Sequence, residues 1–280
     1  MSPIITAALI MAILGLCLSL FLGIAAKVFY VEVDPRIESI LDVLPGANCG
    51  GCGYAGCSDY AEAIVMKNEE PNKCVAGGAN VVEAVCSILG VSASLGERKI
   101  ARIQCRGDNK NAKKNFEYIG AKDCYAAIIA TGGNKACEFG CIGLGSCVEA
   151  CPFGALSMGD NGIPVVNEDI CTGCGCCVNA CPRNIPKLFP ASQKVAALCC
   201  SQETGKTVKS VCKVGCIGCG ICAKKCPEKA IKMVNSLPVI DNKKCTGCLE
   251  CVKKCPTGAM VSLVKETSQE EEQEDKANAA

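Results

Sequence analysis

The longest apolar stretch of the chain lies near its N-terminus and runs from Ile4 to Ala26 without a charged residue. Thr6 and Ser19 are its only hydroxyl side chains, and it contains 23 residues. A continuous helix of this length crosses the hydrocarbon layer of a bilayer with some tilt. We therefore expect residues 1–30 to form a transmembrane anchor.

A cleavable signal peptide is the competing interpretation, because Gly23, Ile24 and Ala25 resemble a small-residue cleavage site. However, no Lys or Arg precedes the apolar run, and the run is too long for the apolar region of a signal peptide. Lys27 and Arg36 follow the run, which by the positive-inside rule places the rest of the chain in the cytoplasm. The pattern favours a single-pass protein of the cell (inner) membrane with a cytoplasmic globular part.

Beyond the anchor, short groups of apolar positions predict brief helices and strands. Ser58 to Ile64 reads as a helix that follows a glycine-rich loop. Two apolar stretches are each followed by a strand-like segment, which predicts two β-hairpins: Ala155–Met158 with Pro164–Val166, and Ala230–Met233 with Pro238–Ile240. The predicted fold class is α+β, with a transmembrane helix, a small helical domain and two tandem modules built on these hairpins.

Cysteine accounts for 28 of the 280 residues, whereas histidine and tryptophan are absent. This cysteine content would indicate disulfides in a short secreted chain. The length and the close cysteine spacing instead indicate metal clusters in a reducing compartment. The lack of His excludes Rieske centres and His-ligated haem. Lys and Arg total 29 against 28 Asp and Glu, so the charge balance gives no indication of nucleic-acid binding.

Four groups of closely spaced cysteines end in Cys-Pro, and three of them follow the full C-x2-C-x2-C-x3-C-P spacing. This is the bacterial ferredoxin pattern for 4Fe-4S clusters, in which the fourth Cys of one group ligates the other cluster. A helix is expected between the third and fourth Cys of each group, where Pro ends it. The three complete ligand sets are Cys171, Cys174 and Cys177 with Cys151; Cys245, Cys248 and Cys251 with Cys226; and Cys216, Cys219 and Cys222 with Cys255.

The segment from Cys137 to Val264 is an internal duplication, in which Cys137 recurs 75 positions later as Cys212. Each copy is expected to form one two-cluster module. In the first copy Leu144 stands where the second copy has Cys219. Cys137 is the natural substitute, and Cys212 is then spare; a three-iron cluster that lacks this ligand is the alternative. The substituted ligand set is Cys137, Cys141 and Cys147 with Cys181.

A different cysteine motif follows the anchor, with the spacing C-x2-C-x4-C-x16-C. Three of its thiolates lie on a glycine-rich loop that opens a helix, whose dipole would favour anionic sulfur. Four thiolates would also suit a structural zinc ion, which is the competing interpretation. The expected ligands of this fifth cluster are Cys49, Cys52, Cys57 and Cys74.

These motifs divide the chain into six segments. We expect a transmembrane anchor, a helical 4Fe-4S domain, a connector, two 2[4Fe-4S] ferredoxin modules and a disordered acidic tail. Their residues are 1–30, 31–80, 81–136, 137–190, 191–264 and 265–280.

The anchor, the segment from Leu44 to Cys74 and the ferredoxin motifs together resemble the B subunits of Rnf complexes, the ion-translocating ferredoxin:NAD oxidoreductases. The resemblance implies an electron-transfer subunit of a redox-driven translocase that has no substrate-converting site of its own. It would accept electrons from soluble ferredoxin and pass them to membrane subunits, with NAD reduced on another subunit. A membrane-tethered polyferredoxin that serves a hydrogenase or CO dehydrogenase is the alternative, and a redox sensor is a third possibility.

Twenty cysteines serve five clusters in this interpretation, which leaves eight without an assigned role. Cys17 lies in the apolar helix and is most simply a small hydrophobic residue. An alternative is that a sixth cluster is held in the connector, by Cys86, Cys105 and Cys124 with Cys200. The remaining unassigned cysteines are Cys176, Cys199 and Cys212.

Overall fold

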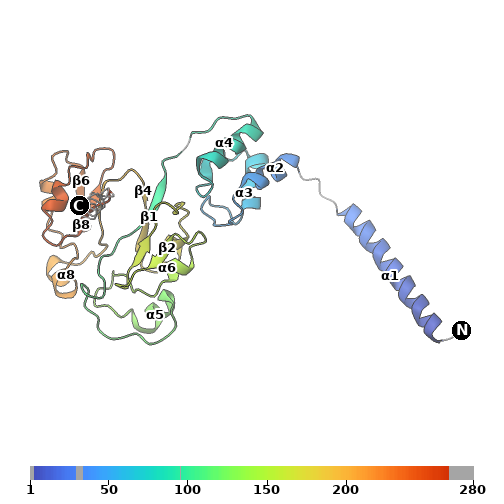
Figure 1. Ribbon diagram of the computed structural model, residues 1–280, viewed down its shortest axis with the longest axis horizontal. Coiled ribbons are helices and arrows are strands. Elements are labelled where there is room, and N and C mark those ends of the chain that lie inside the picture. Colours follow the sequence, from blue (N-terminus) through green and yellow to red (C-terminus); the bar gives the residue numbers. More distant parts are fainter. Residues whose placement is uncertain (1–2, 30–33, 95, 265–280) are drawn as a thin grey trace, which may run out of the picture.

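The computed structural model describes residues 3–29, 34–94 and 96–264. The apolar run forms one helix, α1 (Pro3–Val28), which extends away from the rest of the molecule (Figure 1). Its apolar side chains are exposed, Phe21 at 70% for example. Within the described residues α1 is the one helix long and apolar enough to cross a membrane. The predicted acidic tail, residues 265–280, lies outside the described residues.

A small helical unit follows, which we call the N-terminal unit. Its core is formed by Ile40, Tyr60 and Val85, each at most 1% exposed. The helix expected after the glycine-rich loop is confirmed, as α3. The boundary expected after residue 80 falls inside α4, which packs on α2 and so belongs to this unit. The elements of the unit are α2 (Pro35–Val43), α3 (Cys57–Lys67), the 3-10 helix η1 (Pro71–Lys73) and α4 (Gly78–Leu89).

The first module contains two antiparallel strand pairs, β1–β4 and β2–β3, and two one-turn helices that lie against each other. The predicted hairpin and short helices are confirmed. Strand β1 lies in the segment that we expected to be a connector, yet its buried Ile100 and Ile103 belong to the core of this module. The elements are β1 (Lys99–Ile103), α6 (Ser146–Glu149), β2 (Leu156–Met158), β3 (Pro164–Val166), α7 (Cys176–Asn179) and β4 (Pro186–Pro190).

The second module repeats this plan, with the strand pairs β5–β8 and β6–β7. Its short helices also lie against each other. In both modules a strand that precedes the cysteine groups pairs with the strand that follows the last of them. The elements are β5 (Val195–Ala197), α8 (Gly205–Val211), α9 (Ile221–Lys224), β6 (Ile231–Val234), β7 (Leu237–Ile240), α10 (Glu250–Lys253) and β8 (Met260–Ser262).

The chain between β1 and α6 first runs alongside the second module, near Asn111 to Lys113, and then forms α5 (Cys124–Thr131). The backbone N–H of Lys113 donates to the carbonyl of Val211 at 2.8 Å, and that of Lys213 donates to the carbonyl of Asn111 at 2.9 Å. The expected connector is therefore built into both modules. It joins them into the continuous body seen in Figure 1.

Removal of the buried hydroxyl of Tyr60 tests how far its hydrogen bonds stabilise the N-terminal unit. It donates to the carbonyl of Glu70 at 2.7 Å and accepts from the N–H of Lys73 at 3.1 Å. We expect Tyr60→Phe to lower the free energy of unfolding of this unit by about 1–3 kcal/mol, because two backbone groups lose their partner. Thermal denaturation measures the change. Tyr125→Phe, at a 46% exposed position, is the control, and equal effects of the two variants would contradict the prediction.

Candidate metal centres

Site A lies in the N-terminal unit, where the four predicted cysteines surround one cavity of about 330 Å³. Asn48 shapes the loop that carries three of them, because its Oδ1 accepts from the N–H of Cys57 at 2.8 Å. Burial raises the pKa of the Cys74 thiol, and repulsion from the other three thiols adds to the shift. The structure thus brings together all four residues that the spacing selected: Cys49, Cys52, Cys57 and Cys74.

Site B, in the first module, differs from the ligand set expected from the sequence. Cys124, rather than Cys137, lines the cavity of about 380 Å³ that Cys141, Cys147 and Cys181 surround. Burial raises the pKa of Cys147 to about 12, and the other thiols around this cavity, Cys141, Cys181 and Cys124, add to the shift. Cys137 lines a different cavity. We therefore assign Cys124 as the fourth ligand of site B.

Two local features bring Cys124 to site B. Cys124 is the first residue of α5, and Asp123 caps that helix by accepting from the N–H of Ala126 at 2.6 Å. Ser146, at the start of α6, accepts from the N–H of Cys124 at 2.8 Å and so ties the two helices together. Leu144, which occupies the position of the missing cysteine, packs against the apolar cluster of α5. The leucine thus supports the helix whose first residue supplies the thiol.

Site C is formed by the second cysteine group of the first module together with Cys151. Burial raises the pKa of Cys177 to about 11, with added repulsion from Cys171, Cys174 and Cys151. The structure thus brings Cys151 of the first group beside the three thiols of the second, which is the arrangement that the predicted crossing of ligands requires. The N–H of Ala101 in β1 donates to the Sγ of Cys171 at 3.4 Å, so the strand from the expected connector contributes directly to this site.

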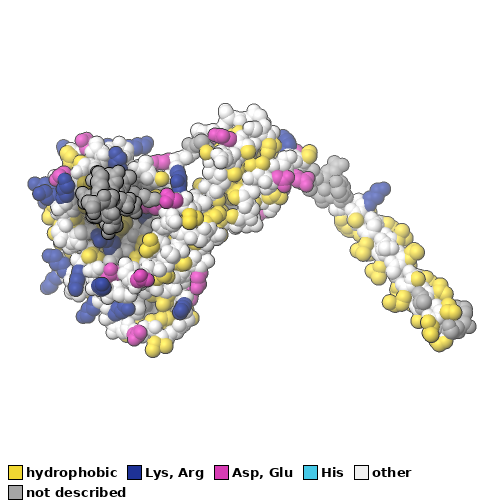
Figure 2. Space-filling model, viewed as in Figure 1, with side chains coloured by type: hydrophobic (Ala, Val, Ile, Leu, Met, Phe, Trp, Pro, Cys, Tyr) yellow, Lys and Arg dark blue, Asp and Glu magenta, His cyan; other side chains and the backbone are white. Residues whose placement is uncertain are grey.

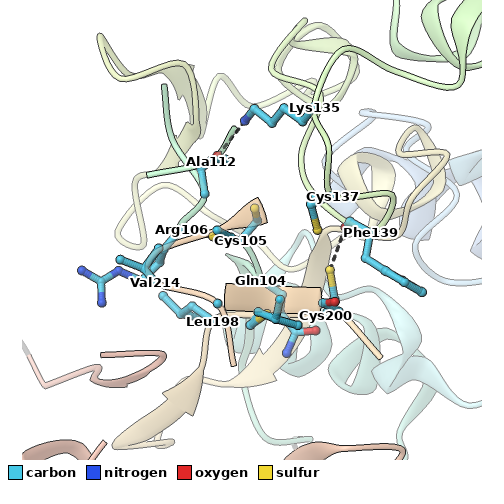
Figure 3. A pocket seen from close by; sticks show the side chains of 17 residues that line it. Gln104, Cys105, Arg106, Ala112, Lys135, Cys137, Phe139, Leu198, Cys200 and Val214 are labelled. Atoms are coloured by element: carbon cyan, nitrogen blue, oxygen red, sulfur yellow. Dashed lines mark hydrogen bonds between the residues drawn. The ribbon is translucent and has the colours of Figure 1, made fainter. Parts of the chain in front are cut away.

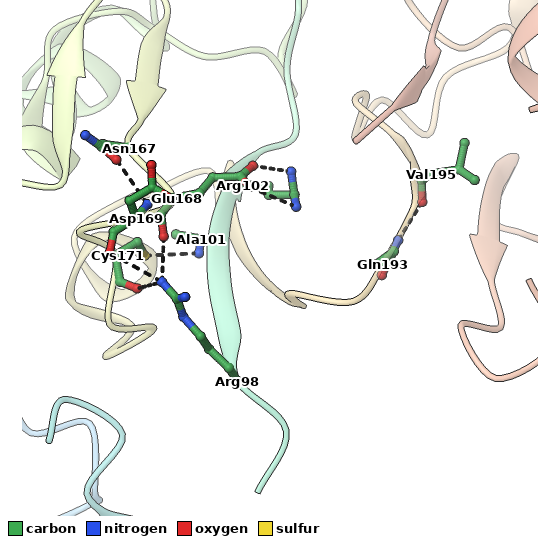
Figure 4. Close-up of polar contacts among 9 residues, drawn as sticks. All are labelled: Arg98, Ala101, Arg102, Asn167, Glu168, Asp169, Cys171, Gln193 and Val195. Atoms are coloured by element: carbon green, nitrogen blue, oxygen red, sulfur yellow. Dashed lines mark hydrogen bonds and ion pairs between the residues drawn. The ribbon is translucent and has the colours of Figure 1, made fainter. Parts of the chain in front are cut away.

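Two arginines hold β1 against the loop that carries Cys171 (Figure 4). The guanidinium of Arg98 donates to the carbonyls of Glu168 at 2.7 Å and of Cys171 at 3.3 Å. Arg102, which is 7% exposed, forms an ion pair with the carboxylate of Glu168. These contacts fix the position of the residues that flank the first thiolate of site C.

Sites D and E lie in the second module and consist of the two ligand sets predicted for it. Burial raises the pKa of the Cys216 thiol, and repulsion from Cys222, Cys255 and Cys219 adds to the shift. The four thiols of site E surround a cavity of about 340 Å³. Site D contains Cys216, Cys219, Cys222 and Cys255, and site E contains Cys226, Cys245, Cys248 and Cys251.

Three of the four cysteines that precede proline accept the same kind of hydrogen bond. The N–H four residues later donates to Sγ in Cys151, Cys181 and Cys226, at 3.3 to 3.4 Å. At Cys255, burial raises the pKa, but backbone N–H groups of residues 257, 259 and 260 outweigh it and the net pKa is lowered. These N–H groups favour the thiolate over the thiol, which is the form that binds metal.

The donor sets fit iron–sulfur clusters. Among residues 3–29, 34–94 and 96–264, no three Cys, Asp or Glu side chains converge closely enough to hold a single metal ion. The thiols of sites A, B and E instead stand around cavities, and the N–H groups beside the thiols can donate to thiolate and sulfide. When bound, a 4Fe-4S cluster would supply one-electron chemistry at each site.

Family models agree with this chemistry. A model described as "Putative Fe-S cluster" matches residues 44–76. Another, described as "4Fe-4S dicluster domain", matches residues 139–185 and again residues 215–259. The matched segments contain site A and the cysteine groups of the two modules. Geometry and matches together define an iron–sulfur protein of the 4Fe-4S type.

Three known proteins are similar to most or all of the chain, and each is the B subunit of a redox complex. The relative from the "Proton-translocating ferredoxin:NAD(+) oxidoreductase complex" of Clostridium ljungdahlii is 46% identical, over 100% of this chain and 99% of the relative. That from the "Ion-translocating oxidoreductase complex" of Methanosarcina acetivorans is 44% identical, over 87% and 92%. That from the "Na(+)-translocating ferredoxin:NAD(+) oxidoreductase complex" of Acetobacterium woodii is 42% identical, over 84% and 71%. The chain belongs to this family, the B subunits of Rnf complexes, as its motifs predicted.

Cys124→Ser tests the ligand set of site B. We expect it to remove or degrade one cluster, with a loss of up to about four iron atoms per chain in anaerobically prepared protein. Iron and acid-labile sulfide analysis measures the loss. Cys86→Ser, in α4 and outside the five sites, is the matched control and should keep full iron. Full iron and an unchanged cluster spectrum in Cys124→Ser would contradict the assignment.

Proposed function

We propose that this chain is the iron–sulfur electron-transfer subunit of a membrane-bound, ion-translocating ferredoxin:NAD oxidoreductase complex. It accepts electrons from reduced ferredoxin and relays them through 4Fe-4S clusters to the membrane subunits, while NAD is reduced elsewhere in the complex. One observation carries the proposal: sets of four neighbouring thiols follow one another from the unit beside α1 to the second module. The names of the relatives support the same complex.

Sites A, B and C lie next to one another in this series, and so do sites D and E. The Sγ of Cys176, beside site C, donates to the carbonyl of Cys49 in site A at 3.2 Å. Helices α6 and α7, which carry thiols of sites B and C, lie against each other, as do α9 and α10 for sites D and E. Close spacing of this kind lets an electron pass from one cluster to the next.

The charge distribution suggests where electrons enter. Residues 191–264 contain twelve Lys and four Asp or Glu, a net charge of +8, whereas residues 137–190 contain two basic and five acidic residues, a net charge of −3. Lys and Arg side chains gather over the second module in Figure 2. Cys219 of site D and Cys248 of site E are exposed. We assign this basic module with accessible clusters as the docking site of an acidic ferredoxin.

The position of α1 suggests where electrons leave the chain. The helix joins the N-terminal unit through a short segment, so site A is the cluster that the chain holds beside its anchor. Figure 2 shows apolar side chains along α1, which suits a lipid or protein environment in the bilayer. Electrons would therefore leave from site A towards the membrane subunits.

Charge reversal tests the docking site. We expect replacement of the exposed Lys224, Lys225, Lys253 and Lys254 by Glu to slow reduction of the full chain by reduced ferredoxin at least about tenfold at low salt. The difference should shrink as ionic strength rises. Stopped-flow absorbance measures the rate constant. Lys67→Glu, exposed on α3, is the control; if that variant were the slow one, electrons would enter at the N-terminal unit instead.

Removal of α1 tests the membrane attachment. We expect a chain that lacks residues 3–28 to move from the membrane to the soluble fraction and to keep its iron, because α1 makes no part of the cluster sites. Fractionation followed by iron analysis checks both points. A truncated chain that stayed in washed membranes, in cells without the other subunits of the complex, would show that α1 is not the anchor.

A further inference from the structure

Five cysteines outside sites A to E meet in one cavity between the two modules (Figure 3). The cavity measures about 410 Å³, close to the 330 to 380 Å³ of the cavities at sites A, B and E. Its cysteines come from four separate parts of the chain. They are Cys105 after β1, Cys137 before the first module, Cys199 and Cys200 after β5, and Cys212 after α8.

The sulfur atoms lie close together around this cavity. A Cβ atom placed on Gly107 would lie 3.5 Å from the Sγ atoms of both Cys105 and Cys212, so these two sulfurs are within twice that distance of each other. The Sγ of Cys200 donates to the carbonyl of Phe139 at 3.0 Å, which holds it beside Cys137. Gly107 leaves the space between the sulfurs open, since any larger side chain would enter it.

A buried positive charge stands beside the cavity. Lys135 is 4% exposed, and its Nζ donates to the carbonyl of Gly107 at 2.7 Å. Its charge lies near Cys212, near Cys141 of site B and near the carboxylate of Asp108. Burial of a lysine is costly unless negative charge compensates it. Asp108 supplies part of that charge, and an anionic cluster held by four thiolates would add to it.

The duplication distinguishes the two adjacent cysteines. Cys199 lies 75 positions after Cys124, the same interval that separates Cys137 from Cys212. Cys199 lies near Cys216 of site D, whose N–H donates to it, and also near Cys105 and Cys137 at this cavity. The thiol of Cys200 lies near Cys105 and Cys137, and its hydrogen bond to the carbonyl of Phe139 orients it towards Cys137 rather than towards site D.

We propose that Cys105, Cys137, Cys200 and Cys212 hold a sixth 4Fe-4S cluster, site F, which connects the two modules. This set shares Cys105 and Cys200 with the connector site expected from the sequence. It replaces Cys86, which lies in α4, and Cys124, which lies in site B. Each copy of the duplication supplies its equivalent cysteine, Cys137 or Cys212, to the shared site.

Site F closes the one long step in the electron path. The N–H of Cys141 in site B donates to the Sγ of Cys105 at 3.4 Å, so sites B and F are in contact. On the other side, Cys199 lies between site F and Cys216 of site D. When bound by these four cysteines, a cluster would supply one-electron chemistry between the second module and the first. This transport role rests on the proposed function, whereas metal binding at the site does not.

Metal analysis of the full chain, prepared anaerobically, tests the site. We expect about twenty-four iron atoms and as many sulfides in the wild type, and about four fewer of each in Cys105→Ser, Cys137→Ser, Cys200→Ser and Cys212→Ser. Cys199→Ser and Cys86→Ser are the matched controls and should keep full iron. Retention of about twenty iron atoms in the ligand variants shows that the other sites still fold.

Two results would overturn the proposal. The first is a wild type with about twenty iron atoms, or with one zinc per chain, in which the four ligand variants lose no iron. The second is full iron in Cys200→Ser together with loss in Cys199→Ser, which would remove Cys200 from the ligand set.

A kinetic readout tests the connecting role separately. With excess reduced ferredoxin, we expect Cys105→Ser to reduce sites D and E at the wild-type rate but sites A to C at least about tenfold more slowly. Unchanged reduction of all sites would contradict that role. If ferredoxin failed to reduce even the wild type, the proposed function would fail while the metal analysis of site F would still stand.

Discussion

The structure depends on sets of four thiolates that must be kept apart from one another, because each set surrounds the space for an iron–sulfur cluster. The cysteines are themselves core residues: Cys141, Cys147, Cys171 and Cys177 lie in the same buried cluster as Ile100 and Ile185. The strands that flank them are only three to five residues long, and such pairs are marginal on their own in water. Cluster binding and folding of each module are therefore coupled, as in other small metal-binding domains.

The two modules that arose by duplication share one fold but use different cysteines for their sites. Both modules enclose their cysteine groups between a leading and a closing strand, but they differ in how they use the cysteines that precede them. In the first module Cys124 completes a site that Leu144 leaves short of one ligand. In the second, the full set at site D leaves Cys199 free, and the neighbouring cysteine faces the junction between modules. A single substitution in one repeat thus changes the role of residues far away in sequence.

The sequence was sufficient to predict whatever is local. The cysteine spacing predicted the ligand sets of sites A, C, D and E that the structure brings together, and the hairpins and short helices beside them followed from apolar positions and proline. It was not sufficient for Cys124 or β1, whose roles depend on contacts across tens of residues. Cys137 was assigned to the nearest incomplete set because spacing contains no information on which side of a loop a thiol faces. The 75-residue interval between Cys124 and Cys199 was the available signal.

The contact between the N-terminal unit and the first module limits which substitutions can be accepted at Gly51. At Gly51 a Cβ atom would lie 2.8 Å from the carbonyl oxygen of Cys174, so the two ligand loops meet backbone against backbone. A side chain there would wedge the loops apart without disturbing the core of either unit. Because tunnelling probability falls steeply with separation, such a change would leave both halves folded and loaded with metal while it insulated one from the other. The first effect of a substitution at Gly51 would therefore fall on electron transfer between the two units rather than on the stability of either.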